Sequence, residues 1–403
     1  MTDFLIAGGG LAGSATAIQL GRMGFSVELF ERSSFPREKP CGEGLMPAGV
    51  AALARLRLDR PLEGAPFKGI RYHYSGRTVQ ARFSTSPFFP QVGLGCRRRI
   101  LDQTIFETAQ NTSGVKVHTG MRVQAPFIES GRISGLVVEG ESLRGRLVIA
   151  ADGARSGLRH RMGLDVPDRR KRIGLRAHFR LAPGQLQSNW VNIHLRQGYE
   201  LYATPLCHRE ILIAALAEVD SLEGPIEKQF QTWCRLEPDI AAVLEGALQI
   251  TDLQVVAPLS GGARRTFLPG CVLLGDAAGF ADPITGGGMT QALLAAEMLA
   301  QFAAEGLAGA NRWIQEFDQA RKELLRDYRR LTDIMLWLAR HRSLATCLLG
   351  VLGRQPRLFS HLLGVASSTH RLLGGRLAFS SLKQKRRSPH RFFFGAKYES
   401  DLP

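Results

Sequence analysis

The stretch Phe4-Leu5-Ile6-Ala7-Gly8-Gly9-Gly10-Leu11-Ala12-Gly13 decides how this chain folds. Its four apolar residues predict a buried strand, and the glycines that follow predict a tight turn into a helix. In such a turn Gly8 permits the sharp bend, Gly10 lets a pyrophosphate approach the backbone, and Gly13 lets the helix pack closely on the strand. The helix N-terminus then offers unpaired N–H groups to the phosphates. We therefore predict a dinucleotide-binding turn, the alternative being a glycine-rich turn that binds no ligand.

An acidic residue stands where this kind of turn requires one. Glu31 ends a second strand expected over residues 26–31, after a helix expected over about 15–20. An acid about 20 residues after the glycines accepts hydrogen bonds from the ribose hydroxyls of an adenosine. Strand, turn, helix, strand and acid together predict one βαβ unit, with Glu31 and the adjoining Arg32 on the adenosine side.

Two further motifs follow in order along the chain. They are Asp152-Gly153-Ala154-Arg155-Ser156-Gly157-Leu158-Arg159 and Gly275-Asp276-Ala277-Ala278-Gly279-Phe280-Ala281-Asp282-Pro283, which continues to Gly286-Gly287-Gly288. Asp276 follows an expected strand and could accept from ribityl hydroxyls. The loop after it opens another helix, whose N-terminus would stabilise the negative charge of a reduced flavin. The ordered trio predicts noncovalent FAD and redox chemistry, although Asp152 and Arg159 alone also fit an ion pair that caps a helix.

The pattern of apolar and polar residues changes between these motifs. Helices expected at 98–111 and about 288–304 accompany strands expected at 147–151 and 271–274. Elsewhere apolar and polar residues alternate, as they do in an antiparallel sheet with one covered face. We predict an α/β fold: a Rossmann-type FAD-binding domain interleaved with an antiparallel β-sheet substrate domain, plus a helical C-terminal region. The predicted ranges are 1–68, 95–165 and 256–330 for the FAD-binding domain, 69–94 and 166–255 for the substrate domain, and 331–403 for the helical basic region. The alternating strands are expected at 69–74, 173–179, 190–195 and 211–215.

The positive charge of the chain belongs to its C-terminal region. The net charge is +16, and residues 334–398 contain no Asp or Glu but twelve Lys and Arg. Apolar stripes such as Leu331, Ile334, Met335 and Leu338 lie between the charges. Two interpretations stay open: helices that pack on the body with a solvated basic face, or peripheral contact with an anionic membrane. Such positive charge could also attract nucleic acid, but the redox chemistry predicted for the rest of the chain does not require it, so we expect no nucleic acid partner.

The composition of the chain argues against several other classes of protein. The six cysteines show no CxxC spacing, so we expect no disulfide framework, no metal site and a cytoplasmic location. The apolar N-terminus lacks a basic segment and is interpreted as a strand instead of a signal peptide. The chain contains no run of 18 or more uncharged apolar residues, so we expect no membrane-spanning helix.

With these motifs, residues 2 to about 330 resemble the flavoprotein family with the para-hydroxybenzoate hydroxylase fold, which includes geranylgeranyl reductases and flavin-dependent halogenases. The resemblance implies that the first motif and Glu31 bind the ADP half of FAD. It implies that Arg98 contacts FAD near its phosphates and ribityl chain, and that Asp152 and Gly153 link FAD to NAD(P)H use. The full set of cofactor-binding residues expected is Gly8, Gly10, Leu11, Ala12, Gly13, Glu31, Arg32, Arg98, Val123, Asp152, Gly153, Asp276, Pro283, Gly286, Gly287, Gly288 and Met289.

One segment resembles the part of geranylgeranyl-reductase-like members that passes over the isoalloxazine ring. It reads Arg37-Glu38-Lys39-Pro40-Cys41-Gly42-Glu43-Gly44, with Glu43 where those members have a glycine. We expect Glu43 and Cys41 as catalytic candidates, since a carboxyl beside the flavin could relay protons. The segment 198–205 resembles the family strand that lines the substrate pocket. The halogenase signature Trp-x-Trp-x-Ile-Pro is not visible in it.

The function expected from these features is that of an FAD-dependent monooxygenase. NAD(P)H is the expected reductant, because the chain has a single dinucleotide fingerprint and a second nucleotide would dock transiently. O2 and a small hydrophobic aromatic, polyketide or lipid-like metabolite are the expected partners. Two alternatives stay open: a geranylgeranyl-reductase-like enzyme acting on carbon–carbon double bonds, and a non-catalytic membrane-associated flavoprotein.

Overall fold

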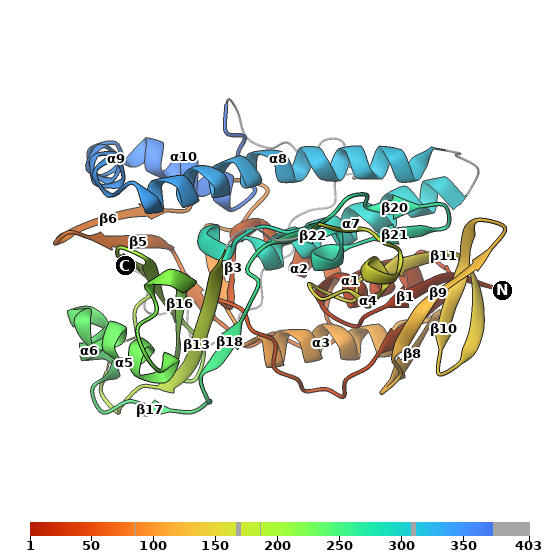
Figure 1. Ribbon diagram of the computed structural model, residues 1–403, viewed down its shortest axis with the longest axis horizontal. Helices are drawn as coiled ribbons and strands as arrows, with labels where there is room; N and C mark the ends of the chain where they lie inside the picture. Colours follow the sequence, from red (N-terminus) through yellow and green to blue (C-terminus); the bar gives the residue numbers. More distant parts are fainter. Residues whose placement is uncertain (85, 167–170, 186, 308–311, 374–403) are drawn as a thin grey trace.

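The computed structural model describes residues 1–84, 86–166, 171–185, 187–307 and 312–373. Two large sheets lie end to end along the molecule, and a helical layer covers one side of both (Figure 1). This arrangement confirms the predicted fold class: a Rossmann-type unit interleaved with a second sheet, followed by C-terminal helices.

The first sheet is built around the glycine-rich stretch. β1 (Thr2–Ala7) pairs in parallel with β2 (Val27–Glu31) and with β11 (Glu141–Ala150), and buried apolar side chains fill these strands. Helices α1 (Leu11–Arg22), α3 (Arg98–Asn111) and α7 (Gly288–Leu307) share one hydrophobic core with the sheet. β8 (Val115–Thr119), β20 (Phe267–Leu268) and β21 (Cys271–Leu273) complete the strand order β20-β21-β11-β1-β2-β8, with β9 (Val123–Glu129) and β10 (Arg132–Val138) paired beside it.

The second sheet differs from the prediction in two respects. Its order is β17-β13-β16-β15-β14-β5-β6, and β14 pairs with β5 in parallel, whereas the remaining pairs on this path are antiparallel. Both faces of β13 and β16 are buried, because Phe230 and Trp233 of α5 cover one face and the other faces the first domain. The prediction of one covered face was therefore wrong for these strands. The bounds are β5 (Gly69–Tyr74), β6 (Arg77–Arg82), β13 (Arg172–Arg180), β14 (Val191–Leu195), β15 (Tyr199–Pro205), β16 (Glu210–Glu218) and β17 (Leu248–Gln249), with β18 (Gln254–Val256) beside β13, and helices α5 (Ile226–Leu236) and α6 (Pro238–Leu244).

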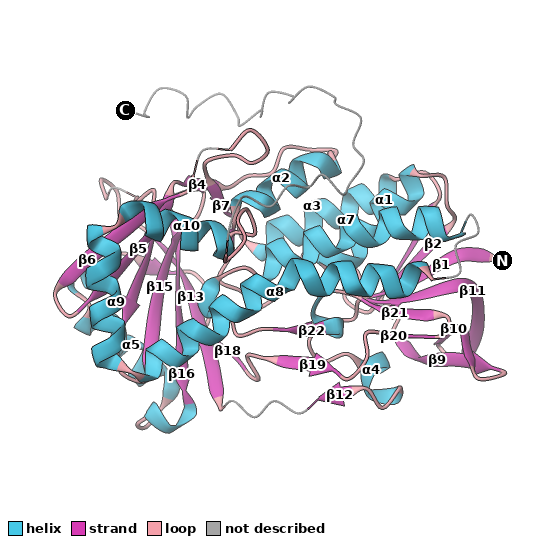
Figure 2. Ribbon diagram, turned by 90° about the horizontal axis from the view of Figure 1, so that it is seen from above, coloured by secondary structure: helices cyan, strands magenta, loops and turns pink. Residues whose placement is uncertain are grey.

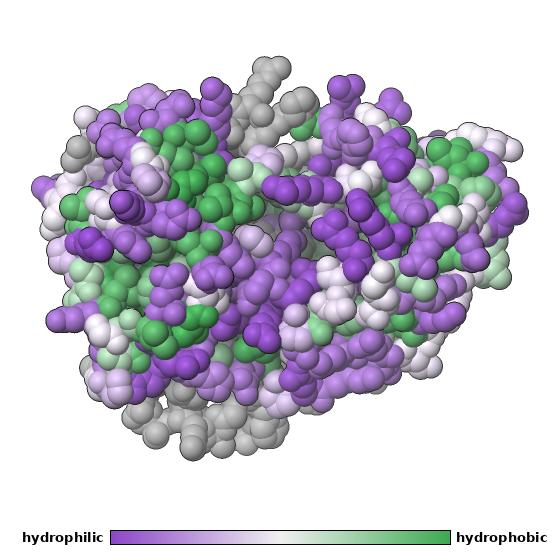
Figure 3. Space-filling model, turned by 60° about the horizontal axis from the view of Figure 1, so that its bottom comes forward, coloured by the Kyte–Doolittle hydropathy of each residue, from purple (hydrophilic) through white to green (hydrophobic). Residues whose placement is uncertain are grey.

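Smaller elements join the two sheets. One three-stranded sheet contains β3 (Gly44–Leu45), β7 (Gly93–Gly95) and β4 (Ala65–Phe67), and another contains β12 (Asp165–Val166), β19 (Gly261–Ala263) and β22 (Gly279–Phe280). Helix α2 (Pro47–Leu56) follows β3, and the short helix α4 (Gly157–Arg161) follows the second motif. On the lower side of the molecule hydrophilic side chains cover the middle, and apolar ones gather over the end that carries the second sheet (Figure 3).

The C-terminal region consists mainly of helices, the last of which ends at Ala366, and the described residues 367–373 are not helical. Helix α8 (Trp313–Arg340) runs across the molecule toward the second sheet, where α9 (Arg342–Arg354) and α10 (Pro356–Ala366) follow it (Figures 1 and 2). Leu331 and Leu338 are buried, Met335 is half-buried and Ile334 is 45% exposed. The predicted stripe thus packs on the body through part of its width. The basic run 383–387 and the aromatic run 392–394 lie outside the described residues.

Candidate active site

The glycine-rich turn has no room for side chains. Gly8 has φ +102°, and a Cβ there would lie 2.5 Å from the carbonyl oxygen of Ala151. A Cβ on Gly13 would lie 1.9 Å from the carbonyl oxygen of Gly8. Both contacts are far below van der Waals distance and involve backbone, which cannot move aside. The turn therefore requires glycine for the reasons that the sequence suggested.

The cleft beside this turn fits the phosphate-bearing part of FAD. Within the described residues, no side chain caps helix α1 at Gly10, so its first N–H groups face the cleft unpaired. A Cβ built at Gly42, Gly153 or Gly288 would meet no described atom within 4 Å, although all three line the cavity. An uncapped helix N-terminus beside open space is a site for a pyrophosphate.

An ordered set of charges surrounds the expected adenosine end. Glu31 is buried, and its carboxylate accepts from Gly9 N at 2.8 Å and from Ser33 N at 2.9 Å. Asp102 holds Arg98 through two bonds of 2.7 and 2.8 Å, and Arg37 Nη2 lies 3.4 Å from Asp102. Arg98 is therefore set in place by its own helix and lines the cavity. Arg37 is not among the predicted cofactor-binding residues, although it belongs to the segment 37–44, which resembles the part of related enzymes that passes over the isoalloxazine ring.

The second motif ties itself to the third. Asp152 accepts from Ser156 Oγ at 2.5 Å and from Leu158 N at 3.1 Å, so it caps α4. Arg159 pairs with Asp165 at 2.6 Å and donates to the carbonyl oxygen of Ala277 at 3.2 Å. The alternative of an Asp152–Arg159 ion pair was wrong, whereas the capping role of Asp152 is present. Arg159 holds the segment that carries Asp276.

Asp276 lies in the short 3-10 turn Gly275–Ala278 that follows β21, and it lines the cavity. Its carboxylate accepts from Lys39 Nζ at 3.1 Å. Burial raises the pKa of Asp276, but Lys39, Arg98 and Arg159 outweigh it and hold the pKa below its ordinary value. An ionised acceptor at this point fits ribityl hydroxyls. The sequence did not single out Lys39 as its partner, because the two residues are 237 positions apart.

The loop from Pro283 to Gly288, here called the flavin loop, is held from the C-terminal side. Gly286 has φ +70°, and Gly287 N donates to the hydroxyl of Tyr328 at 3.3 Å. A Cβ on Gly287 would lie 2.3 Å from the Tyr328 ring. Gly288 begins α7, whose N-terminus therefore meets the cavity, and Met289 is buried beside it. The glycines of this loop serve a close approach of α8 that the sequence did not reveal.

Glu43 occupies a different setting from the one expected. It is fully buried with φ +57°, and its carboxylate accepts from Arg98 N at 2.9 Å, Arg176 Nη1 at 2.7 Å and His178 Nε2 at 2.8 Å. Burial raises the pKa of Glu43, but His178 and Arg176 bring it below its ordinary value. Such a carboxylate stays ionised. Its three hydrogen bonds favour a role in holding the segment in place over a role in relaying protons. Cys41 is half-buried and lines the cavity, and both residues remain catalytic candidates.

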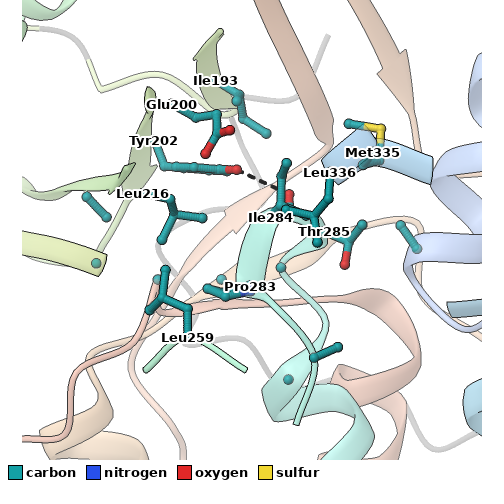
Figure 4. Close-up of a pocket in the computed structure, with 18 of the residues that line it drawn as sticks. Ile193, Glu200, Tyr202, Leu216, Leu259, Pro283, Ile284, Thr285, Met335 and Leu336 are labelled. Atoms are coloured by element: carbon teal, nitrogen blue, oxygen red, sulfur yellow. Dashed lines mark hydrogen bonds between the residues drawn. The ribbon is translucent and has the colours of Figure 1, made fainter. Parts of the chain in front are cut away.

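A cavity of about 950 Å³ opens from these motifs into the space between the second sheet and the C-terminal helices. Glu200 and Tyr202 of β15 face the flavin loop, and Tyr202 donates to the carbonyl oxygen of Ile284 at 3.2 Å (Figure 4). Arg172 pairs closely with Glu200 and donates to Asp282 at 2.8 Å. Burial raises the pKa of Tyr72, and Glu200 adds to the rise. Apolar residues line the far side, among them Leu348, Leu352, Phe359 and Leu363.

Seven of the predicted cofactor residues do not line this cavity: Gly8, Gly13, Glu31, Asp152 and Gly287, whose settings are given above, and Val123 and Arg32. Val123 begins β9 and packs against the core beneath the first sheet, and Arg32 is exposed after β2. Neither position tests a contact with an adenosine, so both remain predictions. Sequence reasoning did not single out Lys39, Arg172, Glu200 or Tyr202 individually, although the last two belong to the strand interpreted as a pocket wall.

Comparisons with known proteins agree with this architecture. A family model described as an FAD binding domain matches residues 1–330. The chain is 29% identical over 319 residues to menaquinone reductase of Mycobacterium tuberculosis, covering 74% of this chain and 76% of the relative. It is 24% identical over 346 residues to digeranylgeranylglycerophospholipid reductase of Methanosarcina acetivorans, covering 81% and 80%. The solved structure of PqsL, a probable FAD-dependent monooxygenase from Pseudomonas aeruginosa, superposes with a TM-score of 0.72 and 19% identity, covering 85% of this chain and 97% of that one.

Proposed function

Because this chain belongs to the FAD binding domain family and is a flavin-dependent oxidoreductase, we propose that it hydroxylates the ring of a lipid-like substrate, using NAD(P)H and O2. The observation behind this proposal is the division of the cavity. A buried polar cluster lies at the flavin loop, and apolar side chains of the second sheet and the C-terminal helices line a separate part of the space. Further polar side chains, such as Arg196 and Arg340, line another part of the wall.

The polar end supports a substrate with a hydrogen-bonding ring next to the flavin. Arg172, Glu200 and Tyr202 are buried or half-buried there and bond to one another or to the flavin loop. A carboxylate such as that of Glu200 can accept more hydrogen bonds than the one that Arg172 donates. The apolar end would take an alkyl or prenyl chain between Val191 or Ile193 of the sheet and Phe359 of α10. A reaction in the middle of an apolar chain would have no use for this polar cluster.

Bound FAD supplies two electrons and the means to activate O2. The chain's own residues would bind and position the reactants: α1 and Gly10 would hold the pyrophosphate, Asp276 the ribityl chain, and the flavin loop the ring. Ile284 and Leu259 form an apolar wall with Leu216 that excludes water from the reacting centre.

The test is a product analysis with two substrates. Purified holoenzyme receives NADPH and either olivetol, a resorcinol ring with a pentyl chain, or menaquinone, in air and without oxygen. We expect olivetol to gain one oxygen atom in air and to stay unchanged without oxygen. Gain of two hydrogen atoms by menaquinone without oxygen that persists after the quinol has been reoxidised to the quinone in air, with olivetol unchanged, would overturn the proposal.

Reduction of a carbon–carbon double bond is the second candidate. It is favoured by the names of the curated relatives, which are reductases and cover about three quarters or more of this chain. The same cavity would then hold a prenyl chain across the flavin loop, and the experiment above separates the two reactions by mass.

We further propose that the C-terminal helices contact an anionic membrane. None of the described helices is both long and apolar enough to cross one. Apolar side chains on α8, α9 and α10 are between 42% and 51% exposed, and the exposed Arg354 and Arg357 lie between two of them. Apolar side chains and arginines together fit the headgroup region of an anionic bilayer. The exposed apolar residues are Ile334, Trp337, Leu344, Val351 and Leu358.

Flotation with phosphatidylglycerol vesicles tests this surface. We expect the protein to float at low salt and to be released at high salt. Replacing Val351 and Leu358 by serine should weaken flotation severalfold. The matched control is Leu236→Ser, because Leu236 is 63% exposed on α5, away from these helices. Equal flotation of both variants would refute the assignment to this surface, and membrane contact, like a cytoplasmic location, stays a prediction until measured.

A further inference from the structure

One buried guanidinium bridges the second sheet and the flavin loop. Glu200, in β15, is 3% exposed, and among the described residues Arg172 is the hydrogen-bond partner of its carboxylate. The other terminal nitrogen of Arg172 donates to Asp282 Oδ1 at 2.8 Å. Asp282 also accepts from Ile284 N at 3.1 Å and so caps the turn that begins the flavin loop. The three side chains form a buried triad at the polar end of the cavity.

The triad carries one more acid than base. With all three groups ionised its net charge is −1. The other titratable groups that face Glu200 are Tyr72 from β5, Tyr202 on its own strand and Glu218 from β16, and Glu218 pairs with Arg340 of α8 at 2.8 Å. Burial raises the pKa of Glu200, Arg172 lowers it, and Asp282 and Glu218 raise it again, to about 7.

The surroundings narrow the chemistry of the group that Glu200 would meet. An ionised carboxylate accepts up to about four hydrogen bonds, and Arg172 provides the donor found here. Tyr202 does not provide another, because its hydroxyl donates to Ile284 O at 3.2 Å. A cationic ligand group would lie beside the Arg172 guanidinium, although the net charge of the ionised triad is −1. A neutral donor attached to a flat ring fits both the carboxylate and the tyrosine rings on the same wall.

We propose that Glu200 selects the substrate by accepting a hydrogen bond from a ring hydroxyl. The inference rests on the proposed function and narrows its substrate class to hydroxylated rings that carry a chain. Arg172 and Asp282 then act as positioning residues: they hold the carboxylate at the boundary between the second sheet and the flavin loop. Selection of this kind is effective because a ring without the hydroxyl leaves a buried acceptor without its second donor.

The experiment measures binding of two probes to oxidised holoenzyme without reductant, from about pH 6 to about pH 8. The probes are olivetol, whose phenolic hydroxyls stay protonated in this range as tyrosine does, and its dimethyl ether, which has no hydroxyl. We expect olivetol affinity to rise roughly tenfold as Glu200 ionises, because a hydrogen bond to a charged acceptor is about twice as strong as a neutral one. The ether should show no such rise.

Two variants separate recognition from folding. Glu200→Gln keeps an oxygen for Arg172 but does not titrate, so its olivetol affinity should be flat with pH. Glu297→Gln is the matched control, because Glu297 is 6% exposed and pairs with Arg55 of α2 outside the cavity. It should keep the wild-type profile. FAD content and thermal unfolding of both variants show whether they fold.

Each outcome decides one of the two claims. A rise with pH that disappears in Glu200→Gln and for the ether supports the inference. A profile that persists in Glu200→Gln, or an affinity that falls with pH as expected for a carbonyl ligand, overturns it while leaving the cavity a ring-binding site. Failure of both probes to bind wild-type holoenzyme at any pH overturns the proposed function, and the inference with it.

Discussion

The two ends of the cavity are built in opposite ways. At the dinucleotide end, the turn Gly8–Gly13 makes its own geometry, and Asp276 reaches the cleft directly after a short strand. At the substrate end, Glu200, Arg172 and Asp282 come from three separated segments and meet only in the folded chain. The first end depends on local backbone shape, whereas the second depends on long-range packing.

This difference predicts unequal responses to mutation. A change in the glycine turn meets rigid backbone and has no way to relax. A change in the substrate wall alters single contacts between side chains, and its effect should be smaller and more specific. The four predictions that follow run from the largest expected effect to the smallest.

Gly13→Ala should abolish FAD binding. Its Cβ would lie 1.9 Å from the Gly8 carbonyl oxygen, so β1 and α1 must separate, which costs about 3 kcal/mol or more of folding free energy. Flavin absorbance of the purified protein and urea unfolding measure the two effects. Gly157→Ala is the control, because a Cβ there meets no described atom within 4 Å. A yellow, stable Gly13→Ala protein would contradict the role given to the turn.

Glu43→Gln should lower the free energy of unfolding by about 3 kcal/mol at neutral pH, since it breaks a buried charge network. The pKa of Glu43 in the folded protein lies below the ordinary value of 4.5, so its ionised form stabilises the protein above that pH. This contribution is lost as pH falls through the folded pKa, and the variant should therefore differ less from wild type in acid. Urea unfolding at neutral and acid pH measures it. Normal stability with a lost proton-transfer step would instead favour the catalytic role.

Asp276→Ala should weaken FAD binding by about ten- to a hundredfold, because hydrogen bonds to a charged acceptor contribute about 1.5–3 kcal/mol. Titration of apoprotein with FAD measures the dissociation constant. Asp3→Ala is the control, as Asp3 pairs with Arg146 away from the cavity. Unchanged FAD affinity in Asp276→Ala would remove this residue from the cofactor site.

Tyr202→Phe should have the smallest effect, about 1 kcal/mol of stability, because it removes one neutral hydrogen bond to Ile284 O. FAD content should not change, since the dinucleotide end is untouched. Thermal unfolding measures this loss of stability. Tyr199→Phe on the same strand is the control, and it should lose less stability because the phenylalanine ring can keep the stacking contact with Trp233. A large loss of FAD in Tyr202→Phe would mean that the two ends are more tightly coupled than their construction indicates.

The sequence alone determined the elements whose signals are local. The glycine turn, the helix at 98–111 and the strand at 69–74 are present as predicted, because periodicity and backbone freedom act within a few residues. The family and its flavin cofactor followed from the order of three such motifs. The basic run 383–387 could be interpreted for its charge alone, and it lies outside the described residues.

The tertiary structure decided the partners of the charged side chains and the shape of the substrate cavity. Lys39 meets Asp276, and Arg172 meets both Glu200 and Asp282, across separations of 28 to 237 residues. Tertiary packing also made the pair of β14 and β5 in the second sheet parallel. It buried both faces of β13 and β16, because helices and the first domain cover them. Side-chain pairing and burial depend on which surfaces meet, and no local pattern encodes that.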